Sequence, residues 1–150
     1  MTKTNELEVR KEKTNHIRGM FDKVAGELTA SVPNYLRDTL TPDHVARLAL
    51  TELRTSKDLW RCSDMSIVGG VILACQHGLR VGIQGECWLI PRKIHGSWQA
   101  VFQLGYRGLV KLAHRSKALL KLETRVVYEN DDFNYQYGSD PDIHNIPHTS

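Results

Sequence analysis

The sequence predicts an α+β fold in which N-terminal helices are followed by a β-hairpin, a short basic helix and further antiparallel strands. Two observations support this prediction. Apolar residues recur at helical spacing up to about Gly85, and beyond it they alternate with polar residues. Glycine and proline residues then separate the expected elements. A chain of 150 residues is expected to form one domain with a substantial core.

The N-terminal third is expected to hold a tail and two helices. Residues 1–14 are polar and charged, which predicts a disordered tail. Apolar residues at helical spacing predict an amphipathic helix over residues 16–30, and Pro33 is expected to end it. Thr41 is expected to cap a second helix over residues 42–54, which has a proline in its first turn.

The middle of the chain is expected to form a buried helix and then a hairpin. Residues 65–77 are apolar on nearly every side, which predicts a helix inside the core, with Gly78 as its C-terminal cap. Alternating residues then predict two strands over residues 86–91 and 98–104, joined by a loop that contains a glycine.

The last third is expected to start with the basic helix, over residues 107–116. Three strands are expected after it, over residues 120–128, 133–137 and 143–146. The residues of the helix expected to face the core are spaced at i, i+3 and i+4; they are Leu109, Leu112 and Ala113.

The segment with the clearest functional signal is the turn from the second hairpin strand into this helix. Arg107, Lys111 and Arg115 recur at i, i+4 and i+8 and form a positive stripe. Gln103 and Tyr106 stand at its start. Cations that follow phosphates beside groups able to touch bases are what single-strand binding requires. We therefore expect these five residues to bind a nucleic acid, although the same stripe could be a solvated helix face and Tyr106 could be a core residue.

A second, weaker basic cluster is expected in the hairpin loop. Arg92 and Lys93 stand there beside His95, and loop cations of this kind are often only solvated. Three aromatic residues of the hairpin could stack on bases, but their alternating spacing favours the core; they are Trp88, Trp98 and Phe102.

Composition narrows the classes of function. The net charge of +3 is only mildly basic, so a nucleic-acid site has to come from clustering of cations. Three cysteines without regular spacing indicate a reducing compartment, and the charged N-terminus has no apolar segment typical of a secretory signal, so we expect a cytoplasmic protein. No apolar run is long enough to span a bilayer.

Metal and enzyme chemistry are not favoured by the sequence. The four residues that could be written as zinc ligands lack the paired spacing of structural zinc; they are Cys62, Cys75, His77 and Cys87. The acidic residues between Glu129 and Asp142 could suggest a Mg²⁺-dependent nuclease, but no lysine or histidine stands at a matching position to act as base. No phosphate-binding glycine loop and no nucleophile triad stand out. We expect no enzymatic activity and no cofactor, with Mg²⁺ at most a counter-ion.

Several segments, taken in order, resemble the RecT family of phage-type recombination proteins. The most diagnostic is Gln103 to Gly108, continued by Leu112, Ala113, Arg115 and Ser116. The others are Leu40 to His44 with Thr51 to Arg54, then Cys62 to Ser66 with the apolar helix that follows, and Val126 to Phe133 with Gly138, His144 and Pro147. The likeness runs from about Leu28 onwards. Lys117 stands where the family usually has a glycine.

This resemblance implies a protein that binds single-stranded DNA and anneals complementary strands without ATP. It also implies self-assembly into rings or filaments and a partner exonuclease. Gln103, Tyr106, Arg107 and Arg115 occupy the family's DNA-contact positions, and Lys111 is added from the helical spacing. Residues 15–150 would be the annealing domain, apparently cut short, since the family has a second, largely helical half.

Two other hypotheses remain open. The chain could be an assembly module or an inactive remnant without DNA binding, in which the helices over residues 16–30 and 42–54 associate with other copies. A metal-dependent nuclease is less favoured.

Overall fold

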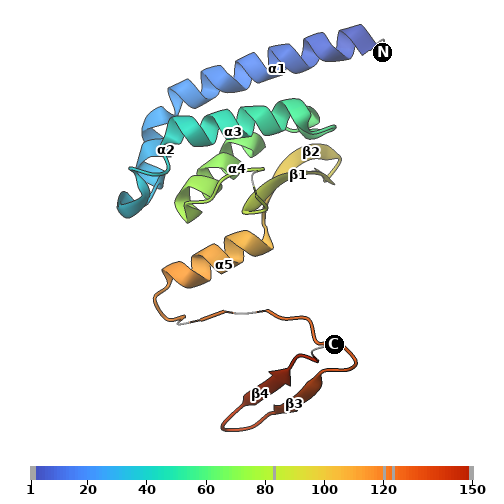
Figure 1. Cartoon of the computed structure of the whole chain (residues 1–150). Coiled ribbons are helices and arrows are strands. Elements are labelled where there is room, and N and C mark those ends of the chain that lie inside the picture. The colour runs from blue at the N-terminus through green and yellow to red at the C-terminus, as the bar shows by residue number, and fades with distance from the viewer. Residues whose placement is uncertain (1–2, 83, 120, 123, 149–150) are drawn as a thin grey trace. The chain divides into compact units, whose positions relative to one another are not determined.

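A computed structural model describes residues 3–82, 84–119, 121–122 and 124–148. The chain divides into two compact units, Met1–Leu119 and Leu120–Ser150, which are considered separately below. Within these described residues, the first unit holds five α-helices, two short 3-10 helices and a β-hairpin, and the second holds a two-stranded antiparallel sheet (Figure 1). This arrangement confirms the predicted α+β fold.

Helix α1 runs over Lys3–Lys23, so it begins well inside the segment predicted to be a disordered tail. Polar contacts explain the difference. Thr14 is buried and donates a hydrogen bond to the Arg10 carbonyl, and Lys13 forms an ion pair with Asp64 at the start of another helix. Arg10 also packs over the ring of Trp60. A count of apolar residues does not register such contacts. Helix α2, Ala25–Ser31, and the 3-10 helix η1, Asn34–Leu36, follow.

Helices α3 (Pro42–Thr55) and α4 (Asp64–His77) begin and end where the sequence predicts, within one residue. The Thr41 side chain accepts a hydrogen bond from the amide of His44, and Gly78 caps α4 in the left-handed conformation. The 3-10 helix η2, Leu59–Arg61, connects them.

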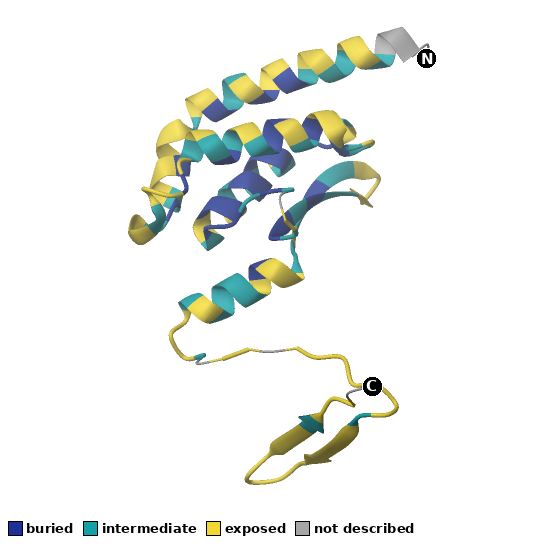
Figure 2. Cartoon of the chain, viewed as in Figure 1, coloured by how far each residue is buried: buried dark blue, intermediate teal, exposed yellow. Residues whose placement is uncertain are grey.

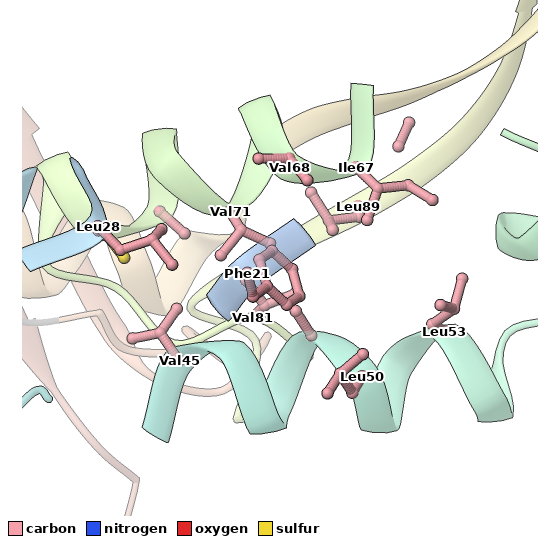
Figure 3. Close-up of a cluster of buried hydrophobic side chains, with 14 of the residues drawn as sticks. Phe21, Leu28, Val45, Leu50, Leu53, Ile67, Val68, Val71, Val81 and Leu89 are labelled. Carbon is pink, nitrogen blue, oxygen red and sulfur yellow. The ribbon is translucent and has the colours of Figure 1, made fainter. Parts of the chain in front are cut away.

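The hydrophobic core of the first unit lies between α1, α3, α4 and the hairpin. Figure 3 shows side chains of α3 and α4 pointing toward one another, with Phe21 of α1 between them. The buried face of α1 continues to Ile17, and Leu89 of the hairpin closes the core. These contacts bury apolar residues of the two segments, residues 16–30 and 42–54, that the assembly hypothesis would use for self-association.

Strands β1 (Cys87–Ile94) and β2 (Ser97–Leu104) pair antiparallel, with Ile94 opposite Ser97 across a two-residue turn. Their inward face packs on α4 and contains Leu89 and Ala100, as the alternation predicts. Trp88 lies on the other face, because the register puts it directly opposite Gln103.

Helix α5, Tyr106–Arg115, turns only part of its predicted face to the core. Leu112 packs against the core as predicted, but Leu109 is 56% exposed, and Gly108 is buried instead. A Cβ on Gly108 would lie 2.0 Å from the Glu86 carbonyl oxygen. The missing side chain therefore lets this side of the helix approach the backbone, and Leu109 turns outward.

The second unit contains strands β3 (Asp132–Gln136) and β4 (Asp142–Ile146), which pair antiparallel close to the predicted positions. The strand predicted over residues 120–128 is wrong: residues 121–122 and 124–128 have no regular structure, and Leu120 and Glu123 lie outside the described residues. Val126 and Tyr128 are exposed, so the alternating pattern meets no layer that would bury it. Figure 2 shows that the β3–β4 hairpin is exposed almost throughout.

Candidate nucleic-acid interface

A small pocket in the first unit brings three cations together. It has a volume of about 260 Å³, and its lining residues come from η1 and the loop after it, the end of α4, and α5. We call it the α5 pocket; it is lined by Leu36, Thr39, Leu40, Gly78, Arg80, Lys111 and Arg115. No carboxylate is among these lining residues, so the pocket is positively charged.

The charge of this pocket is moderated by one buried carboxylate behind it. Glu86 is only 4% exposed, and Arg80 donates to it from both Nε and the backbone amide, at 3.0 and 2.8 Å. Lys111 Nζ lies 2.9 and 3.0 Å from its two oxygens. Burial raises the pKa of the Glu86 carboxyl, but the hydrogen bonds from Arg80 and Lys111 outweigh burial and leave that pKa below its usual value. Glu86 is therefore ionised at neutral pH and holds both cations in place.

Arg115 is held by backbone carbonyls instead of a carboxylate. Its two terminal nitrogens donate to the carbonyl oxygens of His77 and Gly78, each at 2.9 Å. These carbonyls end α4, where unpaired acceptors and the negative end of the helix dipole favour a cation. Gly78 has φ +61°, and a Cβ there would lie 2.8 Å from Arg115. Arg115 thus keeps its full positive charge at the pocket while it caps α4.

A second group of predicted residues stays exposed at the start of α5. Tyr106 is 70% exposed, and Arg107 donates from Nε to its hydroxyl at 3.0 Å. Arg107 has no carboxylate partner within the described ranges. Tyr106 is therefore a surface residue, and the core interpretation of it is wrong.

The outer face of the hairpin leads to this exposed group. Gln103 precedes α5, and its side-chain oxygen accepts a hydrogen bond from Arg92 at 3.2 Å. Half-buried Trp88 lies opposite Gln103 on the same face. Arg92 and Lys93 were predicted in the hairpin loop, but both lie on β1, because the pairing of the two strands continues beyond them. His95 alone of this cluster stands in the turn, and Lys93 and His95 are exposed. This face can offer an aromatic ring, an amide and a guanidinium to a ligand.

The structure divides the predicted stripe instead of keeping it as one row. Lys111 and Arg115 turn toward the core side and line the α5 pocket, whereas Arg107 faces solvent. Arg80, from the loop after α4, joins the pocket. Glu86 was missed as a member of the site. A signal was present, because an acidic residue at the start of a buried strand needs a partner.

Two further observations concern other classes of function. Among the residues that the structure describes, no group of three histidine, cysteine or acidic side chains is placed to hold a metal ion. In the same ranges, no helix has the length and apolar character needed to cross a bilayer.

Comparisons with known proteins find similarity over the part of the chain that contains α4, the β1–β2 hairpin and α5. The sequence profile of the RecT family matches residues 43–150. Protein RecT of Escherichia coli (strain K12) is 32% identical over 126 residues, which cover 81% of this chain and 45% of that protein. The chain thus spans less than half the length of this relative. No solved structure matches this chain. The chain belongs to the RecT family.

Proposed function

We propose that this chain binds single-stranded DNA without sequence preference and takes part in ATP-independent annealing of complementary strands in phage-type recombination. The observation that carries the proposal is the α5 pocket. Arg80, Lys111 and Arg115 line it, and Glu86 is the one carboxylate bound to any of them among the described residues. Two positive charges remain in excess, which suits a phosphate group.

The exposed group would hold the strand beside the pocket. Arg107 supplies a free guanidinium for a phosphate, and Tyr106 supplies a ring and a hydroxyl. On the hairpin, Trp88 offers a ring for base stacking, and Gln103 with Arg92 offers hydrogen bonds to the backbone. Stacking on one face of a base leaves its Watson–Crick edge available to a complementary strand, which annealing requires.

In this proposal the protein is a cytoplasmic, non-enzymatic annealing protein that forms homo-oligomers and works with an exonuclease. It needs no cofactor. Mg²⁺ acts only as a counter-ion that lowers the repulsion between the two strands being paired. Annealing should therefore proceed both with Mg²⁺ and with EDTA, and only its rate should differ.

The test is fluorescence anisotropy with labelled oligo-dT of about 20 nucleotides across about 50 to 200 mM salt. The two excess charges of the α5 pocket and Arg107 make three net cations. At about 0.7 per neutralised phosphate, they predict a slope of roughly −2 for log affinity against log salt concentration. Arg107→Gln should reduce the slope by about 0.7. Arg47→Gln is the control, because Arg47 is also exposed and pairs with Asp43 on α3. Addition of the complementary strand then measures annealing.

Two results would overturn the proposal. One is the absence of oligo-dT binding at low salt by the natural chain. The other is an Arg107→Gln protein whose slope equals that of Arg47→Gln. Trp88→Leu provides an independent check, because loss of stacking should weaken binding by about 1–3 kcal/mol without changing the salt slope.

A second candidate function, assembly without DNA binding, is favoured by the second unit. Phe133 and Tyr135 of β3 and Tyr137 just after it form a row of exposed rings, with centroids 5.9 and 5.2 Å apart. The hairpin also carries acidic residues, which would repel a polyanion; they are Asp131, Asp132, Asp140 and Asp142. Gel filtration with and without oligo-dT separates the two functions, since oligomers that ignore DNA would favour assembly alone.

A further inference from the structure

A second cavity in the first unit is larger than the α5 pocket and is lined by other residues. It has a volume of about 430 Å³ and opens between the first half of α1 and the last turn of α3. We call it the α1–α3 pocket; it is lined by Leu7, Arg10, Lys11, Thr14, Asn15 and Arg54. It shares no lining residue with the α5 pocket.

The lining of this pocket is strongly cationic. Three of its six residues are basic and none is acidic. Lys11 and Arg54 come from different helices, are exposed, and have no ion-pair partner in the described part of the chain. Like charges that converge on one hollow raise the energy of the empty site, and an anion in it lowers that energy.

The third cation is held in place by the fold. One terminal nitrogen of Arg10 donates to Glu6 at 2.8 Å and to the Lys57 carbonyl at 2.9 Å. The guanidinium lies 5.6 Å from the centre of the Trp60 ring. Its Nε is buried and has no hydrogen-bond acceptor among the described residues. Arg10 therefore keeps one unsatisfied buried donor, which is unfavourable, beside its fixed terminal nitrogen.

The walls of the pocket are fixed before any ligand arrives. Lys13 pairs with Asp64, which fastens α1 to the start of α4, and buried Thr14 donates to the Arg10 carbonyl at 2.7 Å. Leu7 adds an apolar patch at the rim, where it is 59% exposed. The site therefore combines one fixed cation, two exposed cations, an amide and a small apolar surface, which suits a phosphate ester better than a bare ion.

We propose that the α1–α3 pocket binds a phosphate group, with Lys11 and Arg54 as its charge partners and Arg10 as a fixed donor. The phosphate can belong to the backbone of a DNA strand or to a free nucleotide. The first source rests on the proposed function, and the second does not.

The lining residues place the two pockets near opposite ends of α3. Thr39 and Leu40 line the α5 pocket just before α3 begins, and Arg54 stands in the last turn of that helix. The 14 residues of α3 span about 21 Å at about 1.5 Å per residue. A strand with about 3.4 Å per nucleotide covers that length in about six nucleotides. Contacts so far apart should contribute additively to binding.

The experiment compares two double variants of the full chain. Lys11→Gln/Arg54→Gln removes the two free cations of the pocket, and Lys23→Gln/Arg47→Gln removes one lysine and one arginine from the same two helices outside it. Both pairs are exposed, so folding, checked by circular dichroism, should be unchanged in both. Binding is measured for oligo-dT of about 20 nucleotides by anisotropy, and for thymidine monophosphate by ³¹P NMR.

We expect the pocket variant to bind oligo-dT roughly tenfold more weakly than the control variant, with a salt slope smaller by about 0.7. If only monophosphate binding is lost, the pocket takes its phosphate from a free nucleotide. Equal behaviour of the two variants with both ligands would overturn the inference. If the natural chain binds oligo-dT but the variants do not differ, the inference fails and the proposed function stands. If it binds only the monophosphate, and through this pocket, the proposed function fails and the inference stands.

Discussion

Replacement of Glu86 by glutamine tests how the α5 pocket is held together. Glu86 is buried and receives hydrogen bonds from Arg80 and Lys111, whose side chains are 33% and 34% exposed. Removing one member of a fully buried charge pair costs about 3–5 kcal/mol. Because both cations are partly solvated and glutamine keeps one acceptor oxygen, we expect the free energy of unfolding to fall by about 2 kcal/mol at neutral pH.

The pH dependence of this loss has a defined sign. The folded-state pKa of Glu86 is lowered from its usual value of 4.5, so its stabilisation is complete above about pH 4.5. It is lost as the pH falls through the lower folded pKa, where the carboxyl becomes neutral like the amide of glutamine. The gap in stability between the natural protein and Glu86→Gln should therefore narrow in acid.

Urea unfolding followed by tryptophan fluorescence measures both effects. With about 2 kcal/mol per molar as the slope, the midpoint should fall by about 1 M urea at pH 7 and by less near pH 3. Glu52→Gln is the control, because burial alone raises the pKa of Glu52 and its ionised form opposes folding above pH 4.5. That variant should be as stable as the natural protein or more so at pH 7. A Glu86→Gln protein without a loss at pH 7, or with a loss that does not depend on pH, would refute the reasoning.

Three further predictions concern packing and reactivity. Gly108→Ala should lower the free energy of unfolding by about 2 kcal/mol in urea melts, because its Cβ would lie 2.0 Å from the Glu86 carbonyl oxygen; an unchanged midpoint would contradict the close approach of α5. Arg115→Gln should lower it by about 1.5 kcal/mol, since charged hydrogen bonds to the end of α4 are lost. Cys75 and Cys87 are buried and burial raises their thiol pKa values to about 11 and about 12, so both should resist Ellman's reagent at pH 8 until urea unfolds the protein. Prompt labelling of the native protein would show that these thiols are accessible.

The elements of this fold that sequence predicts best are those with local signals at both ends. Helix α3 has its threonine cap and α4 has its glycine cap, so both boundaries follow from short-range chemistry. The hairpin follows from alternation and a glycine turn. The first half of α1 could not be predicted in this way, because ion pairs and the Trp60 contact join it to residues about 50 positions away.

The candidate site shows the same division. The spacing of Arg107, Lys111 and Arg115 correctly marks a cationic helix, but it does not say which cations the fold uses internally. That depends on Glu86, which reaches Lys111 only because Gly108 lets α5 approach the backbone. The strand predicted over residues 120–128 failed for a related reason, since alternation describes a face and not the layer that would cover it.

The anchoring of α1 has a practical consequence for anyone dissecting the chain. The RecT family profile matches from residue 43 onwards, yet Ile17, Phe21 and Leu28 fill the interior against α3 and α4. A fragment that begins at the start of the profile match would expose the apolar surface of α3 and α4 and would aggregate in solution. An expressed fragment should begin before Glu6, because the Glu6 carboxylate forms an ion pair with Arg10, which packs over Trp60.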